Sequence, residues 1–561
     1  MNPLLLVDFY KIHHNKMYPE GMTKLYSNFT PRKSRMKGVD KVVVFGIQHF
    51  VLKHIIEGFN HGFFIHGLRS TLGTEKAKEL IISEYKRHCN VDTKHIEALW
   101  DLGYLPIEIK SLEEGSLCPV GVPMLTITNT HPDFAWLVNY LETLLSCELW
   151  QPITSATIAY EYKKLLNKYA LETTGSTEGV QWQGHDFSMR GMSSVESAIL
   201  SGMGHLLSFT GTDTIPAIYS LEQSYSGTGL IGASVPATEH SVMCMGTKED
   251  EIDTFKRLLN LYPEGILSVV SDTWDLWKVC TEYLPQLKEQ ILARDGKLVI
   301  RPDSGDPVDI ICGTAREILK RGVGSFNHET ISLDGTNMIY PTNSFPRTSY
   351  RLNGEFLTVN DWELNSIKPT SEEKGVIELL WDTFGGTINE QGYKVLDPHI
   401  GAIYGDSITL ERAEQICERL KAKGFASTNI VLGIGSYTYQ YNTRDTFGFA
   451  MKATYGEVTY SKPKFPGDNN TETEEREIFK DPITDDGTKK SKKGLLMVKE
   501  IKVYAQGEGE NLDLKYSRLI CLDQCTLEEE SKGLLETVFK NGKLVKTTNL
   551  KEIRNKLNSY K

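Results

Sequence analysis

Residues 297–306 read KLVIRPDSGD. The apolar run Leu-Val-Ile suits a buried strand, and it leads at once into Arg301 and Asp303. A strand that merely ended in a turn would need only turn residues such as Gly, Pro, Asn, Asp or Ser. A charged cluster of both signs therefore indicates a functional site, provided that other strands of the protein end in the same way.

Six further segments between about residues 180 and 436 repeat this order of apolar run, polar end and helix-like stretch. They are VQWQGHDFSMRG (with Arg190), HLLSFTGTDT (Asp213), GASVPATEHS (His240), GILSVVSDTWD (Asp272), IGAIYGDS (Asp406) and NIVLGIGS (Ser436). The strand ends recur roughly every 25–35 residues, the length of a strand–helix unit. Polar ends on about seven strands favour an α/β barrel over an open doubly wound sheet, in which function concentrates at one switch point. We predict an α/β barrel at residues 179–450.

One interval of the repeat, residues 322–394 approximately, is far longer than the others and rich in aromatic and turn residues. We predict an insertion here, partly of β structure, in one loop of the barrel. The helix-like stretches between strands are readable, as in TLERAEQICERLKAKG, which places apolar residues on one face. Ser407 or Thr409 suits the start of that helix, and Gly424 suits its end.

The two flanks differ from the repeat. The N-terminal flank mixes strand patterns (TKLYSNFTPR, KVVVFGI) with helical ones, and Asn541-Gly542 between alternating apolar residues predicts a hairpin. We predict that residues 1–178 and 451–561 build a second, β-rich α+β domain, with N-terminal helices packing on the barrel. DNNTETEEREIF is expected to be an exposed acidic loop, and DDGTKKSKKG a basic loop that is either solvated or in contact with phosphate.

Composition narrows the class of protein. The chain has 561 residues, 40% of them hydrophobic and 24% charged, which is enough for a large core. A net charge of −11 argues against a nucleic-acid partner. No apolar stretch approaches the ~18 residues of a membrane span, and the start lacks a signal peptide, so we expect a cytoplasmic protein. The nine cysteines are scattered, and the closest pair, Cys521 and Cys525, lacks nearby histidines; we expect reduced thiols and no zinc site.

If the strand ends converge, one site holds several kinds of chemistry. Its members are Arg190, Arg301, Phe187, His240, Asp213, Asp272, Asp303, Asp406, Gly405 and Gly435. Guanidinium groups and glycine N–H groups match phosphate oxygens, and carboxylates suit Mg²⁺ carried on a phosphorylated ligand. An aromatic ring suits a flat heterocycle. Together they suggest a phosphorylated sugar meeting an aromatic base.

Each residue alone also has a simpler reading. A single aspartate at a strand end commonly caps a helix, a lone histidine is commonly structural, Phe187 suits the core, and glycines suit tight turns. Repetition of the same placement on several strands is what favours a functional site.

The sequence becomes similar to a known family at these residues. HDFSMRG, GTDT, SVPATEHS, SVVSDTWD, IRPDSGDP, YGD and TRD occur in that order, preceded by VDFYKIHHNKMYP and followed by FKDPITDDGTKKSKKG and VFKNGK. Together they closely resemble the nicotinamide phosphoribosyltransferase family over nearly the whole chain. The resemblance implies a type II phosphoribosyltransferase barrel with a second domain, in a homodimer whose active sites are shared between subunits. It implies transfer of phosphoribosyl from phosphoribosyl pyrophosphate to nicotinamide in NAD salvage.

The resemblance also implies residue roles in the nicotinamide pocket. Phe187 and Tyr10 of the partner subunit would hold the ring between them, and Asp213 would accept a hydrogen bond from the carboxamide. Ser268 and Arg301 would lie near the amide oxygen and ring. Asp8 of the partner subunit would border the same pocket.

Further roles implied by the resemblance concern phosphate and ATP. The phosphate-binding residues would be Arg190, Gly405, Asp406, Gly435, Ser436, Arg32, Arg444, Lys452, Lys480 and Lys489, with Arg32, Arg444 and Lys452 reaching across from the partner subunit. His240 would be phosphorylated by ATP, a co-substrate, so that ATP hydrolysis is coupled to the transfer. Asp272 and Asp303 would lie nearby and hold Mg²⁺, directly or through water.

Two residues depart from the family pattern. Ser436 follows Gly435 where a second glycine is expected, and Ala450 replaces a hydroxyl. The nearest alternative function is nicotinate phosphoribosyltransferase, but Asp213 would repel a substrate carboxylate. A barrel aldolase or isomerase would need a lysine or base at a strand end, and these strand ends present no lysine. A non-catalytic phosphosugar- or nucleotide-binding protein is the alternative from another class.

Overall fold

The computed structural model describes the chain except residues 228, 315–329, 334–335, 340–348, 353–354, 361–362, 368–369, 406, 465–468, 485–490, 507–511 and 561. Two predicted phosphate-binding residues, Asp406 and Lys489, lie outside the described residues. All nine cysteines are free thiols. Within the described part of the chain, no helix combines the length and apolar character needed to cross a bilayer.

Six parallel strands form the sheet predicted for the central region. In spatial order they are β7 (Gly211–Thr212), β6 (Gly184–Asp186), β18 (Ile430–Ile434), β17 (Ile400–Tyr404), β9 (Asp295–Arg301) and β8 (Glu264–Val270). Residues 233–237 connect the two edges, because Ala233 bridges to Gly211 and Ala237 bridges to Ser268, both in parallel. The sheet therefore curls round on itself, and the predicted α/β barrel is confirmed.

The segment at 233–237 was expected to be a full strand but makes only these isolated bridges. Pro236 lacks the N–H group that a continuous ladder needs, although its carbonyl still accepts the N–H of Ser268 at 2.9 Å. The barrel is thus closed by two short contacts on either side of a proline.

Helices follow the strands and cover the outside of the barrel. They are α9 (Val195–His205), α10 (Ile215–Tyr225), α11 (His240–Met245), α12 (Glu251–Leu261), α13 (Leu276–Lys278), α14 (Leu284–Leu292), α15 (Pro307–Cys312), α16 (Ser371–Phe384), α17 (Leu410–Ala422) and α18 (Ser436–Tyr439). In α17 the apolar face predicted from the sequence is buried, and the side chain of Thr409 accepts the N–H of Arg412 as a cap. That helix prediction is confirmed.

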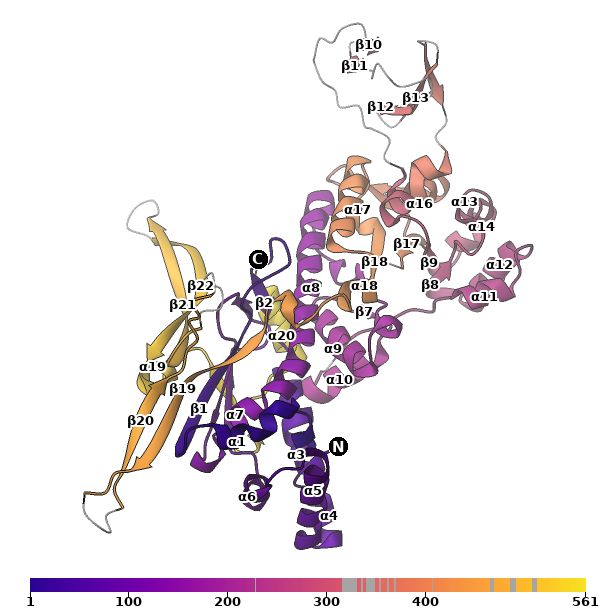
Figure 1. The fold of residues 1–561 in the computed structure, drawn as a ribbon. Coiled ribbons are helices and arrows are strands. Elements are labelled where there is room, and N and C mark those ends of the chain that lie inside the picture. The colour runs from indigo at the N-terminus through magenta and orange to yellow at the C-terminus, as the bar shows by residue number, and fades with distance from the viewer. Residues whose placement is uncertain are drawn as a thin grey trace.

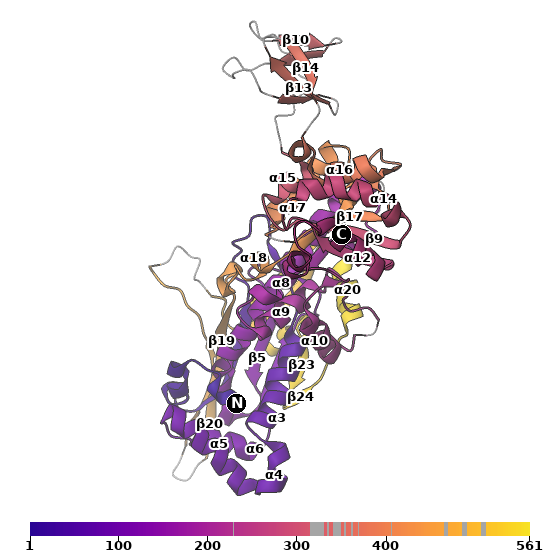
Figure 2. The same cartoon turned by 90° about the vertical axis from the view of Figure 1, so that its right-hand side faces the viewer.

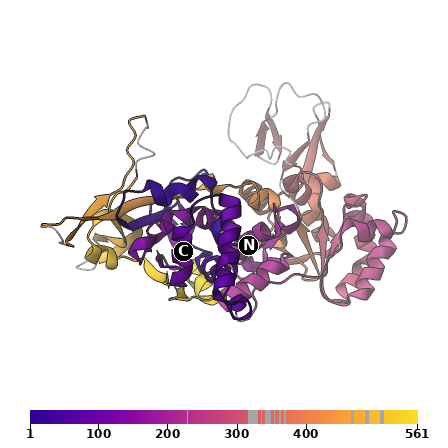
Figure 3. The same ribbon diagram turned by 60° about the horizontal axis from the view of Figure 1, so that its bottom comes forward.

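The chain ends combine in a seven-stranded sheet. Its order is β20 (Thr471–Glu477), β19 (Ala450–Ser461), β1 (Met22–Thr30), β5 (Leu125–Asn129), β3 (Ile107–Ser111), β23 (Glu536–Lys540) and β24 (Lys543–Leu544). Indigo and yellow segments, from opposite ends of the sequence, lie together in Figure 1, Figure 2 and Figure 3. The predicted hairpin joins β23 to β24, with positive φ at both Asn541 (51°) and Gly542 (78°), as its two-residue turn requires.

Smaller elements complete this part of the fold. The short strands β2 (Lys41–Val43) and β4 (Leu117–Pro119) pair, and β21 (Leu495–Gln506) pairs with β22 (Leu512–Cys525). The remaining helices are α1 (His14–Met17), α2 (Ile47–Phe50), α3 (Gly58–Gly62), α4 (His66–Leu72), α5 (Thr74–Cys89), α6 (Lys94–Leu102), α7 (Leu137–Tyr140), α8 (Glu142–Thr174), α19 (Leu527–Ser531) and α20 (Leu550–Asn558). The domain limits at 178/179 and 450/451 stay a prediction.

The long helix α8 links the antiparallel sheet to the barrel (Figure 1). Leu144 and Leu149 near its start belong to the core under the antiparallel sheet, whereas Tyr162 and Leu166 belong to the barrel core. Because one continuous helix contributes to both cores, it fixes their relative position.

Two sequence predictions need correction. The acidic stretch predicted as a loop contains β20, an edge strand whose alternating Thr and Glu side chains are mostly exposed. The insertion predicted at about 322–394 ends earlier, because α16 packs Val376, Ile377 and Leu380 into the barrel core. Among the residues described between α15 and α16, the elements are β10 (Thr330–Leu333), β11 (Thr336–Ile339), β12 (Ser349–Leu352), β13 (Glu355–Asn360) and β14 (Glu363–Ile367). Figure 2 shows β10, β13 and β14 beyond these helices, away from the antiparallel sheet.

Phe29 and Phe449 join segments more than 400 residues apart. Their rings stack at 5.4 Å and 5° in the core under the antiparallel sheet, with both side chains fully buried. Truncating a buried phenylalanine removes its burial energy and leaves a cavity, so Phe449→Ala is expected to lower the free energy of unfolding by about 3–5 kcal/mol. Urea titration followed by tryptophan fluorescence measures this change; an unchanged midpoint would contradict it.

Candidate active site

The carboxyl ends of the barrel strands form the mouth of the barrel. The register between neighbouring strands determines which side chains face the inside of this mouth. His185 pairs laterally with Gly211 and with Gly433, so all three positions face the same side of the sheet. Side chains alternate along a strand, so Phe187 and Asp213, each two residues further on, face that side as well. The parallel register of β8 and β9 places Arg301 beside Val270 at the same end.

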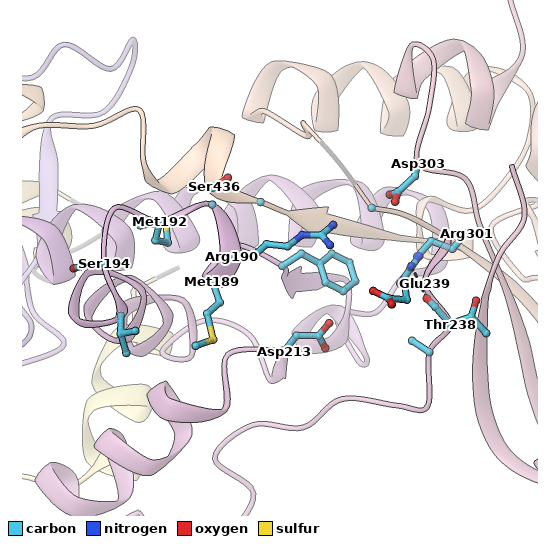
Figure 4. A pocket seen from close by; sticks show the side chains of 16 residues that line it. Met189, Arg190, Met192, Ser194, Asp213, Thr238, Glu239, Arg301, Asp303 and Ser436 are labelled. Atoms are coloured by element: carbon cyan, nitrogen blue, oxygen red, sulfur yellow. Dashed lines mark hydrogen bonds between the residues drawn. The ribbon is translucent and has the colours of Figure 1, made fainter. Parts of the chain in front are cut away.

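These strand ends surround one cavity of about 1050 Å³. Eight predicted site residues line it: Phe187, Arg190, Asp213, Arg301, Asp303, Gly405, Gly435 and Ser436. Figure 4 shows the labelled side chains of Arg190, Asp213 and Arg301 around the same space, although their elements are far apart in sequence. The predicted convergence is therefore observed for these residues, whereas His240 and Asp272 do not line the cavity.

Asp213 is held by two side chains on neighbouring elements. The Nε2 of His185 lies 3.0 Å from its Oδ1, and the hydroxyl of Ser234 donates to the same oxygen at 2.5 Å. Burial acts to raise the pKa of Asp213, but the hydrogen bonds from His185 and Ser234, with the charge of Arg301, lower it below the ordinary value. Asp213 is thus an ionised carboxylate at the cavity wall.

The turn that carries Asp213 is fixed from below. Asp186, fully buried at the end of β6, accepts hydrogen bonds from the hydroxyls of Thr212 at 3.1 Å and Thr214 at 2.8 Å. The two threonines of the GTDT motif thereby connect it to Asp186 of the HDF motif. The backbone N–H of Ser188 donates to the other oxygen of Asp186. Asp186 is a structural residue of the site rather than a ligand-facing one.

Two arginines supply positive charge to the cavity. Arg301 donates to the carbonyl of Thr238 at 2.6 Å, while its Nε is buried without a hydrogen-bond partner. Burial lowers the pKa of Arg301, and neighbouring Asp303 and Asp213 oppose that effect. Arg190 follows β6 on a short 3₁₀ helix, Met189–Gly191, and faces the same cavity. Guanidinium groups in this position suit phosphate oxygens.

Asp272 and His240 lie next to the cavity, beside the lining residue Asp303. One oxygen of Asp272 accepts the N–H of Asp303 at 2.8 Å and the hydroxyl of Ser304 at 2.5 Å. Its other oxygen, Oδ1, is buried without a hydrogen-bond partner and lies 3.7 Å from Nε2 of His240. The His240 side chain is 49% exposed, so a soluble reactant can reach it.

An oxygen of this kind fits a divalent cation. A buried carboxylate oxygen left without a donor is costly unless a cation or a protonated group compensates it, and Mg²⁺ prefers carboxylate and water oxygens. Asp272 and Asp303 therefore fit Mg²⁺ bound directly or through water.

The remaining predicted residues on the barrel contribute differently. Ser268 is buried, its hydroxyl has no partner among the described residues, and it does not line the cavity. The departure at Ser436 is accommodated by Gly191, where an added Cβ would lie 2.0 Å from the serine hydroxyl. Ala450 begins β19 opposite Thr30, away from the cavity lining.

Six other predicted residues are absent from the cavity of the same chain. They are Asp8, Tyr10, Arg32, Arg444, Lys452 and Lys480. Burial lowers the pKa of Lys452, the charge of Glu142 opposes that effect, and the charges of Arg32, Lys480 and Arg444 lower the pKa further, so these three cations lie near Lys452. Tyr10 is 61% exposed. The predicted site residues thus form two groups, one at the barrel mouth and one on the N- and C-terminal part of the chain.

Sequence reasoning left several cavity residues without a role. Glu239 and Thr238 adjoin His240 at a strand end that the sequence reveals. Met189 lies within HDFSMRG, and Met192, Ser194 and Val195 follow that motif. His185 stands beside Phe187 in the same motif. Position at a strand end was the sequence signal that could have identified these residues. The contact between His185 and Asp213 depends on the register between neighbouring strands, which a single sequence does not show.

Comparison with known proteins shows which class of protein this fold and site belong to. The model of the nicotinate phosphoribosyltransferase (NAPRTase) family matches residues 182–543, and that of the nicotinamide phosphoribosyltransferase N-terminal domain matches residues 2–109. The solved structure of nicotinate-nucleotide pyrophosphorylase from Pyrococcus furiosus shares the fold, with a TM-score of 0.51, 13% identity and coverage of 99% of this chain and 95% of that one. Fold and site together define a type II phosphoribosyltransferase.

Full-length relatives narrow the assignment. Nicotinamide phosphoribosyltransferase of Acinetobacter baylyi is 46% identical over 576 residues, covering 99% of this chain and 97% of that protein. The enzyme of the same name from Mycoplasma pneumoniae is 37% identical over 468 residues, covering 80% and 88%. The chain belongs to the nicotinate phosphoribosyltransferase family, and within it to the nicotinamide phosphoribosyltransferases. The predicted family and enzyme class are confirmed.

Proposed function

We propose that this chain transfers the phosphoribosyl group of phosphoribosyl pyrophosphate to nicotinamide, giving nicotinamide mononucleotide and pyrophosphate in cytoplasmic NAD salvage. The observation that supports this best is the single cavity at the barrel mouth. An aromatic ring (Phe187), an ionised acceptor (Asp213) and two guanidinium groups (Arg190 and Arg301) face one space. Ring, amide and phosphate can therefore be bound side by side.

Nicotinamide is proposed to stack on Phe187 with its carboxamide directed to Asp213. Aromatic faces bind flat rings through dispersion and quadrupole interactions. An ionised carboxylate only accepts hydrogen bonds, so it pairs with the amide NH₂ and repels the carboxylate of nicotinate. This is the observation that favours nicotinamide over nicotinate as the substrate.

The transfer itself requires no general base. The bond from C1 of ribose to the pyrophosphate oxygen breaks with its electron pair leaving on pyrophosphate, and the lone pair of the pyridine nitrogen forms the new bond to C1. Nicotinamide carries no proton on that nitrogen. The chain's tasks are then to align the ring and to stabilise the departing negative charge, which Arg190 and Arg301 are placed to do. Mg²⁺ held by Asp272 and Asp303 would add positive charge at the leaving group.

ATP is proposed as a co-substrate that phosphorylates His240. Nε2 of His240 faces Asp272, which leaves Nδ1 to accept the phosphoryl group as ADP departs. A phosphohistidine at the edge of the cavity places negative charge next to the metal-binding carboxylates. That charge tightens binding of the Mg²⁺–pyrophosphate end of the substrate, which couples ATP hydrolysis to the transfer.

We propose a homodimer with shared active sites. Phe187 is the aromatic residue that lines the cavity, whereas Tyr10 is exposed and does not line it. A second subunit would supply Tyr10 and Asp8 to the ring, and Arg32, Arg444, Lys452 and Lys480 to the phosphates.

The function is tested by measuring nicotinamide mononucleotide formed from nicotinamide, phosphoribosyl pyrophosphate and Mg²⁺, with and without ATP. Product formation, stimulated by ATP, is expected; nicotinate should react far more slowly. Faster reaction with nicotinate would favour the alternative function of nicotinate phosphoribosyltransferase. Binding without any product would favour the phosphosugar-binding alternative.

Asp213→Asn tests the basis of substrate choice. Asparagine removes the negative charge and adds an NH₂ donor, so repulsion of nicotinate is lost and the bond to nicotinamide weakens. Because a hydrogen bond to a charged group contributes about 1.5–3 kcal/mol, the preference for nicotinamide, as a ratio of kcat/KM, should fall at least about tenfold. Competition between the two substrates measures that ratio directly, and full retention of wild-type discrimination would exclude Asp213 from this role.

A further inference from the structure

His185 makes the only imidazole contact to Asp213 that the described residues provide, and its position is built into the barrel. It lies on β6 with its ring against Phe187, at 4.4 Å between ring centroids and 39° between planes. Its side chain is 11% exposed, so it has little freedom to turn into solvent. One histidine thus touches both the ring-stacking and the amide-recognising residue.

Gly211 makes this reach possible. It is the lateral partner of His185 on β7, and a Cβ added there would lie 2.7 Å from Nδ1 of the imidazole, closer than real side chains pack. With no side chain at position 211, the imidazole crosses β7 and brings Nε2 within 3.0 Å of Asp213. The carboxylate can only accept, so Nε2 must carry the proton in this contact.

The two oxygens of Asp213 are therefore unequal. Oδ1 accepts hydrogen bonds from both His185 and Ser234, whereas no hydrogen bond to Oδ2 occurs among the described residues. Figure 4 shows the carboxylate turned into the cavity. With Oδ1 occupied by two donors, the carboxylate keeps one orientation, and one free acceptor oxygen remains for a ligand.

We propose that His185 is the positioning residue that sets selectivity for the amide over the acid, by holding Asp213 as an acceptor with one oxygen free for the carboxamide. This rests on the proposed function, since it names what tunes the same pocket. Without His185, Asp213 is held through Ser234 alone among the described residues and can turn towards Arg301, whose charge lies close enough to affect it. Nicotinamide then loses its acceptor, and nicotinate meets less repulsion.

Two substitutions separate the donor from the ring. His185→Phe keeps an aromatic side chain against Phe187 but removes the donor, whereas His185→Gln keeps an N–H near the position of Nε2 and removes the ring. The nicotinamide-to-nicotinate ratio of kcat/KM should fall about tenfold or more in His185→Phe, as for a lost charge-assisted hydrogen bond, and recover most of the way in His185→Gln. KM for nicotinamide should rise while KM for phosphoribosyl pyrophosphate stays within about twofold, because the phosphate-binding arginines are untouched.

A double-mutant cycle shows whether His185 acts through Asp213. In an Asp213→Asn background, His185→Phe should change the ratio by less than about twofold, because residues that act as a unit are not additive. The matched control is His399→Phe. His399 also pairs with an aspartate, Asp397, at 2.7 Å from Nδ1, but it precedes β17 at the opposite end of the barrel. That control should keep wild-type selectivity.

Wild-type selectivity in His185→Phe, or an equal effect of that change with and without Asp213, would overturn the inference. Should His185→Phe fail to fold, as judged by circular dichroism, Ser234→Ala removes the other donor to the same oxygen and should lower the ratio in the same direction; unchanged selectivity there would again overturn it. A wild-type enzyme that forms no nicotinamide mononucleotide would instead refute the proposed function, so the two failures are distinguishable.

Discussion

Mixed dimers of Tyr10→Ala and Arg301→Ala subunits are expected to recover activity that neither variant shows as a homodimer. Loss of Arg301 removes a preorganised positive charge at the leaving group and should lower kcat about 10²–10³-fold. Loss of Tyr10 removes one face of the proposed ring sandwich. Each homodimer carries its defect in both sites.

Complementation follows from where the two residues lie. Arg301 lines the cavity at the barrel mouth, and Tyr10 is exposed outside it. In a two-fold dimer with shared sites, the mixed species has one site with both residues intact and one with both replaced. Purified mixed dimers should therefore show about half of the wild-type activity, and a random mixture about a quarter.

Two differently tagged subunits, co-expressed and purified through both tags, supply the mixed dimer for the activity assay. The matched control pairs Arg301→Ala with Asp213→Ala, two changes at the same barrel mouth. No site in that mixed dimer is intact, so its activity should stay low. Equal recovery in both pairs, or none in the Tyr10 pair, would contradict a pocket that spans two subunits.

Much of the barrel could be predicted because its signal is local. The run KLVIRPDSGD becomes β9 and the turn after it, with Arg301 as the last residue of the strand. A parallel strand buried on both sides reads as a short apolar run, and its carboxyl end carries the chemistry whatever the neighbouring strands do. Arg301 and Asp303 were therefore recognisable before any contact was known.

What could not be predicted depends on contacts across the sheet. The bridge by residues 233–237 needs two partner strands, Gly211 on one side and Ser268 on the other, and its proline hides it from a strand pattern. The contact of His185 with Asp213 needs the register of β6 and β7 and the missing side chain of Gly211. A single sequence contains each residue but not the pairing.

The predictions for the edge strand β20 and for the end of the insertion were wrong for a different reason. The acidic stretch around Glu472–Glu475 has the polarity of a loop, yet it pairs with β19 as an edge strand, where both faces can be polar because solvent covers them. Helix α16 was predicted as part of the insertion because it lies within the same long interval between two barrel strands. Its buried Val376 and Leu380 show that the barrel repeat resumes at Ser371.

Replacing His240 with alanine is expected to abolish the stimulation by ATP while leaving a slow, ATP-independent synthesis. The ring-binding residue Phe187 and the guanidinium groups are untouched, so the transfer itself remains possible. The substitution removes an imidazole that is half exposed to solvent and whose Nε2 lies 3.7 Å from Oδ1 of Asp272. This imidazole is the nitrogen-bearing group best placed to accept a phosphoryl group beside the proposed metal-binding carboxylates. The ratio of rates with and without ATP should fall to about one in this variant, since its only proposed route for coupling is gone.

Two readouts make this result specific to phosphoryl transfer. Incubation with γ-labelled ATP should give an acid-labile, base-stable label on the wild type and none on His240→Ala. His399→Ala, which removes another histidine next to an aspartate but at the far end of the barrel, should keep both the label and the stimulation. Asp272→Asn should reduce the stimulation while leaving His240 in place, because the negative charge that faces Nε2 of His240 is gone. If His240→Ala were still stimulated by ATP, the coupling would have to run through another residue, and the phosphohistidine proposal would fail without affecting the assignment of the transfer reaction.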